Sequence, residues 1–217
     1  IPYPDDPDRS LAEQRRIVAR LELLLGETRA MREDIQAMRR DLAQVMESVL
    51  AEVFPNPNEE MPKGWGWRRL GDLQICEIIM GQSPPGDTYN DIGQGLPFFQ
   101  GKSDFGDLYP TPRKWCTSPT KISLPGDVLI SVRAPVGPTN LTAEKSIIGR
   151  GLAALRPGKN IFTKYLLYSL RAFEKRLTSM GSGSTFSAIS KSNLEQFSIP
   201  IPYPDDLARS LAEQRRI

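Results

Sequence analysis

The sequence predicts an α+β protein in which one long coiled-coil α-helix leads into a mixed, strand-rich globular domain. The first observation behind this prediction is an apolar repeat that runs without proline through residues 10–53. The second is the abrupt change, beyond Pro55 and Pro57, to short apolar runs separated by Gly, Pro and Ser. Regular heptads indicate a coiled coil, whereas short apolar runs bounded by turn residues indicate strands.

Apolar residues of the predicted long helix recur at alternating steps of four and three residues. The series is Ile17, Leu21, Leu24, Thr28, Met31, Ile35, Met38, Leu42, Val45 and Val49. Only Thr28 is not apolar, and the positions between are mostly Arg, Glu, Asp and Gln. A seam of period 3.5 beneath a charged outer face is typical of a coiled coil. At 1.5 Å per residue this helix would be about 65 Å long, which indicates a spacer or a dimerisation element.

The start of the long helix carries two capping signals. Asp6 and Pro7 can serve as the N-cap and the first helical residue, while Ser10 and Glu13 form a capping box three residues later. At the other end, the prolines that follow the apolar repeat stop the helix.

The globular domain is expected to contain several short strands and two helices. The predicted strands are Trp65–Leu70, Leu73–Met80, Pro97–Gln100, Asp127–Arg133 and one or two within Ser146–Leu155. Residues 81–126 are rich in Gly, Pro, Ser and Asp and should be mainly loops. Apolar spacing predicts a helix over Thr163–Met180 that stops at Gly181, then a short helix near Ser190–Glu195 and an extended exit at Phe197–Tyr203.

The two ends of the chain carry nearly the same sequence. Residues Ile1–Ile17 recur as Ile201–Ile217 with 15 of 17 positions identical. The offset of 200 residues indicates one complete unit followed by the opening of a second. We therefore divide the chain into the long helix at 1–57, the globular domain at 58–200 and the start of a second long helix at 201–217.

Composition limits the classes of function. There is no histidine, and Cys76 and Cys116 stand far apart without C-x-x-C spacing. These features argue against a zinc site and against a Ser-His or Cys-His nucleophile. No apolar run approaches the length of a membrane span and no leader opens the chain, so the sequence predicts a cytoplasmic protein.

Charge is divided between the two parts of the chain. Residues 1–60 hold 8 Lys/Arg and 13 Asp/Glu, whereas residues 61–200 hold 17 and 10. A basic globular part favours a polyanionic partner, because phosphates attract Lys and Arg whatever the sequence that carries them.

Two enzyme motifs are incomplete. Gly101-Lys102-Ser103 resembles the end of a phosphate-binding loop, but Leu96 stands where its first glycine is required. Ser83-Pro84-Pro85 resembles an amino-methyltransferase signature, but Gly86 replaces the aromatic residue that should stack on the target base. No cluster of carboxylates that could hold a nuclease metal stands out. We predict no catalytic residue and no metal site.

Three loops combine basic and hydroxyl residues, which can bind phosphates and read base edges. The loops are residues 98–106, 113–121 and 181–187. The candidate DNA-binding residues in and near them are Lys102, Ser103, Arg113, Lys114, Thr117, Lys121, Arg133, Ser182, Ser184, Thr185 and Lys191. The aromatic residues Phe98, Trp115 and Phe186 of these loops are expected to belong to the core.

Six segments carry a family resemblance. They are Gly101–Gly106, Arg113–Ser123, Pro125–Gly137, Ile148–Ala154, Gly181–Lys191 and Leu211–Ile217. Together they resemble the target recognition domains of specificity subunits of type I restriction-modification systems. This chain has one domain and one complete helix, so it resembles half of such a subunit.

The resemblance implies a fold, partners and a division of labour. In that family, two DNA-recognition domains are held apart by two long antiparallel helices and read a bipartite target. It implies double-stranded DNA, methyltransferase (modification) subunits and restriction subunits as partners. It also implies that this chain binds no cofactor, because the modification subunits hold S-adenosylmethionine.

An apolar seam with no partner in its own chain predicts a homodimer, because exposing the seam to water costs free energy. Antiparallel pairing of two long helices would place one domain at each end and match the two-domain plan of the family. Two identical domains related by a dyad should read an interrupted palindrome, with the helix length setting the gap.

Two other classes of function stay open at the level of the sequence. One is a coiled-coil adaptor whose globular domain binds protein and shows no salt-dependent affinity for DNA. The other is a free-standing enzyme, which the lack of histidine and of a complete motif disfavours. The packing of residues 201–217 is also open, because residues 1–17 of a partner chain are expected at the same place.

Overall fold

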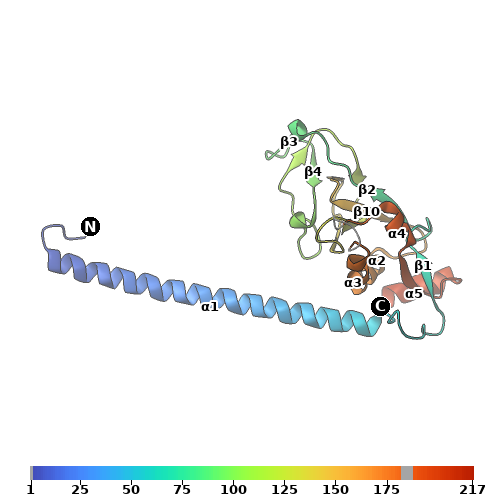
Figure 1. Cartoon of the computed structure of the whole chain (residues 1–217), viewed down its shortest axis with the longest axis horizontal. Helices are drawn as coiled ribbons and strands as arrows, with labels where there is room; N and C mark the ends of the chain where they lie inside the picture. The colour runs from blue at the N-terminus through green and yellow to red at the C-terminus, as the bar shows by residue number, and fades with distance from the viewer. Residues whose placement is uncertain (1, 182–187) are drawn as a thin grey trace. The chain divides into compact units, whose positions relative to one another are not determined.

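The computed structural model describes residues 2–181 and 188–217, and the chain divides into two compact units, Ile1–Val49 and Leu50–Ile217. The first unit consists mainly of α1 (Pro7–Val53), a single α-helix of 47 residues (Figure 1). The second unit is strand-rich and carries four shorter α-helices among its described residues. The predicted α+β class, with one long helix and a strand-rich part, is confirmed.

The long helix begins at the first of its two predicted start signals. The side chain of Asp6 accepts a hydrogen bond from Arg9 N at 3.0 Å, as an N-cap does, and Pro7 is the first helical residue. Ser10 lies inside the helix and its N–H already donates to Asp6 O at 2.9 Å. Ser10 therefore does not act as an N-cap, and the capping box predicted for Ser10 and Glu13 does not start the helix. The helix ends at Val53, two residues before the first of the predicted stop prolines.

The seam of α1 is exposed to solvent along its whole length. Its nine apolar residues range from 40% exposed at Leu24 to 70% exposed at Met38. Thr28, the polar member of the seam, uses its hydroxyl to donate to Leu25 O at 2.9 Å. The side chains that would pair in a coiled coil have no cover within the described chain.

In the described part of the second unit, the strands form three β-sheets. A two-stranded antiparallel sheet pairs β1 (Trp65–Arg69) with β11 (Ser198–Pro202). A four-stranded antiparallel sheet has the order β2-β10-β7-β8, with the bounds Cys76–Met80, Leu152–Pro157, Val128–Ser131 and Thr139–Leu141. A five-stranded sheet has the order β3-β5-β4-β9-β6, with the bounds Tyr89–Asn90, Trp115–Cys116, Leu96–Phe99, Ser146–Ile148 and Ile122–Ser123. In this last sheet β4 and β9 run parallel.

Short helices complete the second unit. The α-helices are α2 (Thr163–Ala172), α3 (Glu174–Met180), α4 (Lys191–Gln196) and α5 (Leu207–Arg216), and the 3-10 helices are η1 (Gly86–Thr88) and η2 (Lys102–Asp104). The single helix predicted over residues 163–180 is thus two helices. Phe173 leaves helical geometry between them, with φ −106° and ψ 19°, and packs its ring 6.3 Å from that of Phe54 and 5.8 Å from that of Trp67. Gly181 caps α3 as predicted.

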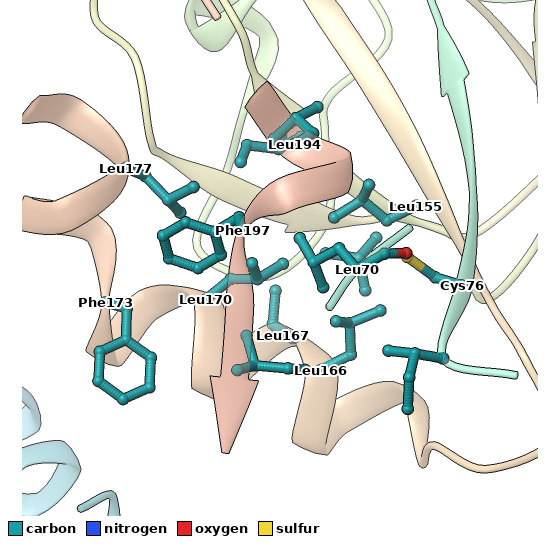
Figure 2. Packing of buried hydrophobic residues seen from close by; sticks show 14 of the residues in the cluster. Leu70, Cys76, Leu155, Leu166, Leu167, Leu170, Phe173, Leu177, Leu194 and Phe197 are labelled. Atoms are coloured by element: carbon teal, nitrogen blue, oxygen red, sulfur yellow. The ribbon is translucent and has the colours of Figure 1, made fainter. Parts of the chain in front are cut away.

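The main core lies where α2, α3 and α4 pack against the strands (Figure 2). The apolar positions predicted for the helix over 163–180 are all buried, among them Leu166, Leu170 and Leu177. Cys76 is buried in the same cluster, and its Sγ donates to Leu70 O at 3.1 Å. Burial raises the pKa of the Cys76 thiol to about 12, so this cysteine is a structural residue rather than a nucleophile.

Candidate nucleic-acid interface

Five loops of the second unit meet at one place. They contain residues 82–83, 99–104, 120–121, 132–133 and 149–151, and we call them the loop cluster. The backbone hydrogen bonds that join them run from Gly149 N to Phe99 O (2.8 Å), from Gln82 N to Ile148 O (3.0 Å), from Ile148 N to Lys121 O (2.9 Å) and from Val132 N to Gly151 O (2.9 Å). Because β4 and β9 are parallel neighbours, the loops that follow their C-terminal ends leave the sheet on the same side.

Gln100 lies at the centre of the loop cluster. Its side-chain amide is hydrogen bonded to Ser83 Oγ, with its Nε2 at 3.1 Å and its Oε1 at 3.2 Å. Ser83 Oγ also accepts a hydrogen bond from Arg150 N at 3.2 Å. The side chains of Gln100 and Arg150 are both exposed. The exposed amide of Gln100 and the backbone of the exposed Arg150 are therefore joined through one serine hydroxyl.

Two glycines allow this close approach. A Cβ on Gly151 would lie 2.3 Å from Gln100 O, and a Cβ on Gly149 would lie 2.6 Å from Gln100 Oε1. Both distances are far below van der Waals contact. A side chain at position 151 would clash with the Gln100 backbone, and one at position 149 would displace the Gln100 amide. The Gly149-Arg150-Gly151 turn thus runs directly against Gln100 and presents only the Arg150 side chain to solvent.

Four of the candidate residues that the sequence predicted belong to the loop cluster. Lys102 and Ser103 form η2, directly after Gln100, and both are exposed. Lys121 is exposed and is tied to β9 through its carbonyl oxygen. Arg133 is exposed and follows Val132, whose N–H bonds to the Arg150 turn.

The remaining candidates lie outside the loop cluster. Lys114 O accepts a hydrogen bond from Phe98 N at 2.9 Å, which places Arg113 and Lys114 at the start of β5, beside β4. Thr117 N bonds to Thr88 O at 3.2 Å, at the end of β5. The other candidates are Lys191 in α4, whose Nζ lies 3.7 Å from Glu195 Oε1, and Ser182, Ser184 and Thr185, which lie outside the described residues.

Of the aromatic residues expected in the core, Phe98 is buried and stacks on Tyr89 with ring centroids 4.7 Å apart. Trp115 is half-buried, and Phe186 lies outside the described residues.

One acidic group of the loop cluster is already hydrogen bonded, and burial disfavours the charged form of another nearby. One carboxylate oxygen of Asp104 accepts from Gln100 N at 2.7 Å and from Gly101 N at 3.3 Å. Burial raises the pKa of Glu174 at the start of α3, and the positive charges of Arg171 and Lys102 oppose that shift. The exposed charges of the loop cluster are therefore mainly cationic.

Sequence reasoning missed Ser83, Gln100 and Arg150. Signals for two of them were present. Arg150 is a lone cation between two glycines, and Gln100 stands between a buried apolar run and Gly101. What no pattern in the sequence indicated is that Ser83, from a segment read as an incomplete methyltransferase motif, bridges the two.

Among residues 2–181 and 188–217, no three His, Cys, Asp or Glu side chains gather in a way that could hold a metal ion. Across the same part of the chain, no helix has the length and apolar character that crossing a membrane requires.

An exposed amide among four cations, carried on loops of a strand-rich unit, is an arrangement typical of nucleic-acid-binding surfaces. The family model for the type I restriction modification DNA specificity domain matches residues 62–217. The chain belongs to that family, and the resemblance seen in the sequence is confirmed. Its members are specificity subunits, which are not catalytic.

Relatives and solved structures agree with this assignment. A Methanocaldococcus jannaschii protein assigned as the MjaX type I restriction enzyme specificity subunit is 42% identical over 144 residues, covering 66% of this chain and 34% of that protein. The Escherichia coli EcoR124I/EcoR124II specificity subunit is 25% identical over all of this chain and 53% of its own length.

Among solved structures, the HsdS subunit of Thermoanaerobacter tengcongensis is 50% identical with a TM-score of 0.65, covering 94% of this chain and 50% of that one. A chain from a structural study of complex assembly and conformational transition of the type I R-M system is 51% identical with a TM-score of 0.70, over 95% of this chain and 51% of that one. The chain therefore spans at most about half the length of the relatives it matches.

Proposed function

We propose that this chain recognises DNA sequence for a type I restriction-modification complex and that it does so through the loop cluster. The observation that carries the proposal is the amide of Gln100, held by Ser83 beside the exposed Arg150. In this proposal, residues 1–57 form the spacer and dimerisation helix, residues 58–200 the target recognition domain, and residues 201–217 the start of a second long helix.

Base reading falls to Gln100 and Arg150. A glutamine amide can pair with N6 and N7 of adenine, and an arginine fork with O6 and N7 of guanine, each discriminating by about 1–3 kcal/mol against the wrong base. Such readout requires side chains that hold one orientation. The hydrogen bonds to Ser83 supply this for the Gln100 amide, and the bond from Arg150 N fixes the backbone that carries the arginine.

The cationic side chains around Gln100 and Arg150 bind the phosphates in this proposal. Lys102, Lys121 and Arg133 are exposed and come from three separate loops, so together they can follow a curved phosphate backbone. Ser103, Arg113, Lys114, Thr117 and Lys191 extend the same role to neighbouring elements. Binding of this kind weakens steeply with salt, unlike docking on a protein partner.

The exposed seam of α1 supports a homodimer. Nine apolar side chains in one stripe of the long helix would be covered if two helices paired antiparallel. Each helix continues into its own globular unit at its C-terminal end, so the pair would present two identical readers related by a dyad. The proposed target is a bipartite, palindromic sequence with a fixed gap.

Modification and restriction subunits are the proposed protein partners. The bound sequence would direct them to the site, with S-adenosylmethionine held by the modification subunits rather than by this chain. This division fits a chain that belongs to a family of non-catalytic specificity subunits.

Binding selection tests the proposal. The chain, co-purified with its modification subunits, is incubated with random duplexes at two salt concentrations, and methylated positions in the selected DNA are mapped. We expect two identical half-sites in inverted orientation and affinity that falls with salt. A single asymmetric block would contradict the homodimer, and affinity independent of salt and sequence would contradict DNA recognition itself.

A further inference from the structure

The two copies of the repeated sequence have the same local structure. Tyr3 and Tyr203 both adopt the left-handed region, with φ 49° and φ 45°, which non-glycine residues rarely enter. In each copy a backbone hydrogen bond closes the turn, from Asp6 N to Tyr3 O at 3.1 Å and from Asp206 N to Tyr203 O at 3.0 Å. In each copy an arginine lies over the tyrosine ring, Arg9 at 4.0 Å from the Tyr3 ring and Arg209 at 3.5 Å from the Tyr203 ring. In each copy a glutamine donates to a serine four residues earlier, Gln14 Nε2 to Ser10 Oγ at 3.1 Å and Gln214 Nε2 to Ser210 Oγ at 3.0 Å.

The C-terminal copy is docked on the globular unit. Its first residues, Ile201 and Pro202, end strand β11, which pairs with β1. Tyr203 N then donates to Gly64 O at 2.6 Å, and a Cβ on Gly64 would lie 2.5 Å from the Tyr203 ring. The left-handed turn at Tyr203 therefore lies directly against the globular unit.

Gln214 anchors the following helix, α5. It is only 2% exposed. Its Oε1 accepts from Phe162 N at 2.8 Å, and its Nε2 donates to Asn160 O at 3.1 Å. This one side chain satisfies two backbone groups just before α2. We call β1, Gly64 and residues 160–162 the docking surface.

The N-terminal copy carries the same groups without that surface. Gln14 is exposed, and of the three hydrogen bonds that Gln214 makes it retains the one to the serine four residues earlier. The two copies differ only at Pro7/Leu207 and Asp8/Ala208. Both Leu207 and Ala208 are exposed in the docked copy. The groups that dock from Tyr203 to Gln214 are thus present, in the same local geometry, from Tyr3 to Gln14.

The geometry points to residues 2–17 as a second docking segment, which occupies the docking surface of another copy of this chain. The inference rests on the homodimer proposed above. A segment that retains a left-handed Tyr3 and an exposed Gln14 is already in the bound shape, so little ordering entropy opposes its docking. The occupant is a second globular unit of this same fold, because only that surface is known to fit the segment.

One docking surface then has two competing segments. Residues 201–217 reach it through their own chain, whereas residues 2–17 reach it from the partner. Weakening the first should favour the second, so substitutions at twin positions should act on dimerisation with opposite sign. A purely local structural role at each end would not give this reversal.

Sedimentation equilibrium of the full chain tests the inference with Gln14→Ala, Gln214→Ala and, as a matched control, Gln44→Ala in the middle of α1. We expect Gln14→Ala to raise the dimer Kd about tenfold, since it removes hydrogen bonds at two symmetric sites. Gln214→Ala is expected to lower the Kd, and Gln44→Ala to leave it unchanged. Asp5→Ala and Asp205→Ala form a milder twin pair that preserves the fold, because Asp205 is exposed and only pairs with Arg68 at 3.0 Å.

The outcomes separate the two proposals. If the chain is a stable dimer and Gln14→Ala has the same dimer Kd as Gln44→Ala, the docking inference is overturned but the homodimer is not. If Gln14→Ala and Gln214→Ala change the dimer Kd in the same direction, the docking inference is also overturned. A monomeric wild-type chain overturns both the docking inference and the homodimer, while DNA recognition by the loop cluster is decided separately by the binding selection.

Discussion

Ser83 and Gln100 are hydrogen bonded to each other across 17 residues of sequence, at 3.1 and 3.2 Å. Ser83 is itself anchored, because Tyr89 OH donates to the carbonyl of the neighbouring Pro84 at 2.7 Å. The Tyr89 ring in turn stacks on Phe98, two residues before Gln100 in β4. The incomplete methyltransferase motif is thus a rigid brace that holds one amide side chain at the surface.

Replacing Gln100 with Ala should abolish discrimination at one base pair of each half-site, a loss of about 1–3 kcal/mol for the preferred base. Ser83→Ala removes the brace and leaves the amide, so it should weaken discrimination at the same base pair by a smaller amount. Competition binding against duplexes altered one position at a time measures both effects. Effects of the two variants at different base pairs would contradict the brace.

Lys121→Ala serves as the control for those variants. A phosphate contact carries no sequence information, so its loss should weaken binding to all duplexes alike and reduce the salt slope by about one. A change in base preference for Lys121→Ala would assign it to base reading instead.

Much of the fold could be predicted because its apolar patterns are local. The heptads of α1 and the apolar run of β7 are explicit in the sequence, and both elements are present. Four strands, β3, β5, β6 and β8, have only two or three residues and lie within or beside segments dominated by turn residues. Their pairing comes from tertiary contacts, which no local period reveals.

The site was only partly predictable for the same reason. Cations such as Lys102 and Lys121 could be chosen by residue type alone. Gln100 becomes prominent only when the Gly149–Gly151 turn and Ser83 are brought beside it, through contacts between distant segments. The break at Phe173 is similar, because an aromatic contact with Phe54 replaces helical continuity there.

Asp127→Ala should destabilise the globular unit by about 1–3 kcal/mol, because it removes the acceptor of Leu124 N and leaves the partly exposed Arg156 paired with Glu77 alone. Asp127 is 2% exposed, and its carboxylate accepts from Arg156 at 3.0 and 3.1 Å and from Leu124 N at 2.8 Å. Urea unfolding followed by circular dichroism measures the loss. The exposed Asp87→Ala is the control, and a loss no larger than that control's would show the pair to be dispensable.

Glu174→Gln should stabilise the chain at pH 7 and have little effect near pH 3. Burial raises the pKa of Glu174, so its ionisation costs stability as pH rises from the unfolded value through the folded one. Below the pKa of the unfolded chain, the Glu174 carboxyl is neutral in both the folded and the unfolded state. Replacing it with an amide then gives no gain in stability. Partial exposure limits the gain to less than about 1 kcal/mol. Urea midpoints at the two pH values test this, and an equal gain at both would exclude ionisation as its cause.

Ile35→Asp should disrupt the proposed dimer while leaving the monomer intact. Ile35 is 52% exposed in the single chain, so a carboxylate there remains hydrated and costs the monomer little. In a paired seam the same carboxylate is buried, twice per dimer, at about 2 kcal/mol each, which raises Kd about a thousandfold. Gln36→Asp, one position away on the outer face of α1, introduces the same charge outside the seam and should leave Kd nearly unchanged. Sedimentation equilibrium compares the two, and equal dissociation constants would mean that the seam faces something other than a second α1. Because seam pairing sets the distance between the two readers, the Ile35 variant should also lose affinity for full bipartite DNA while retaining the weak affinity of one unit for a half-site.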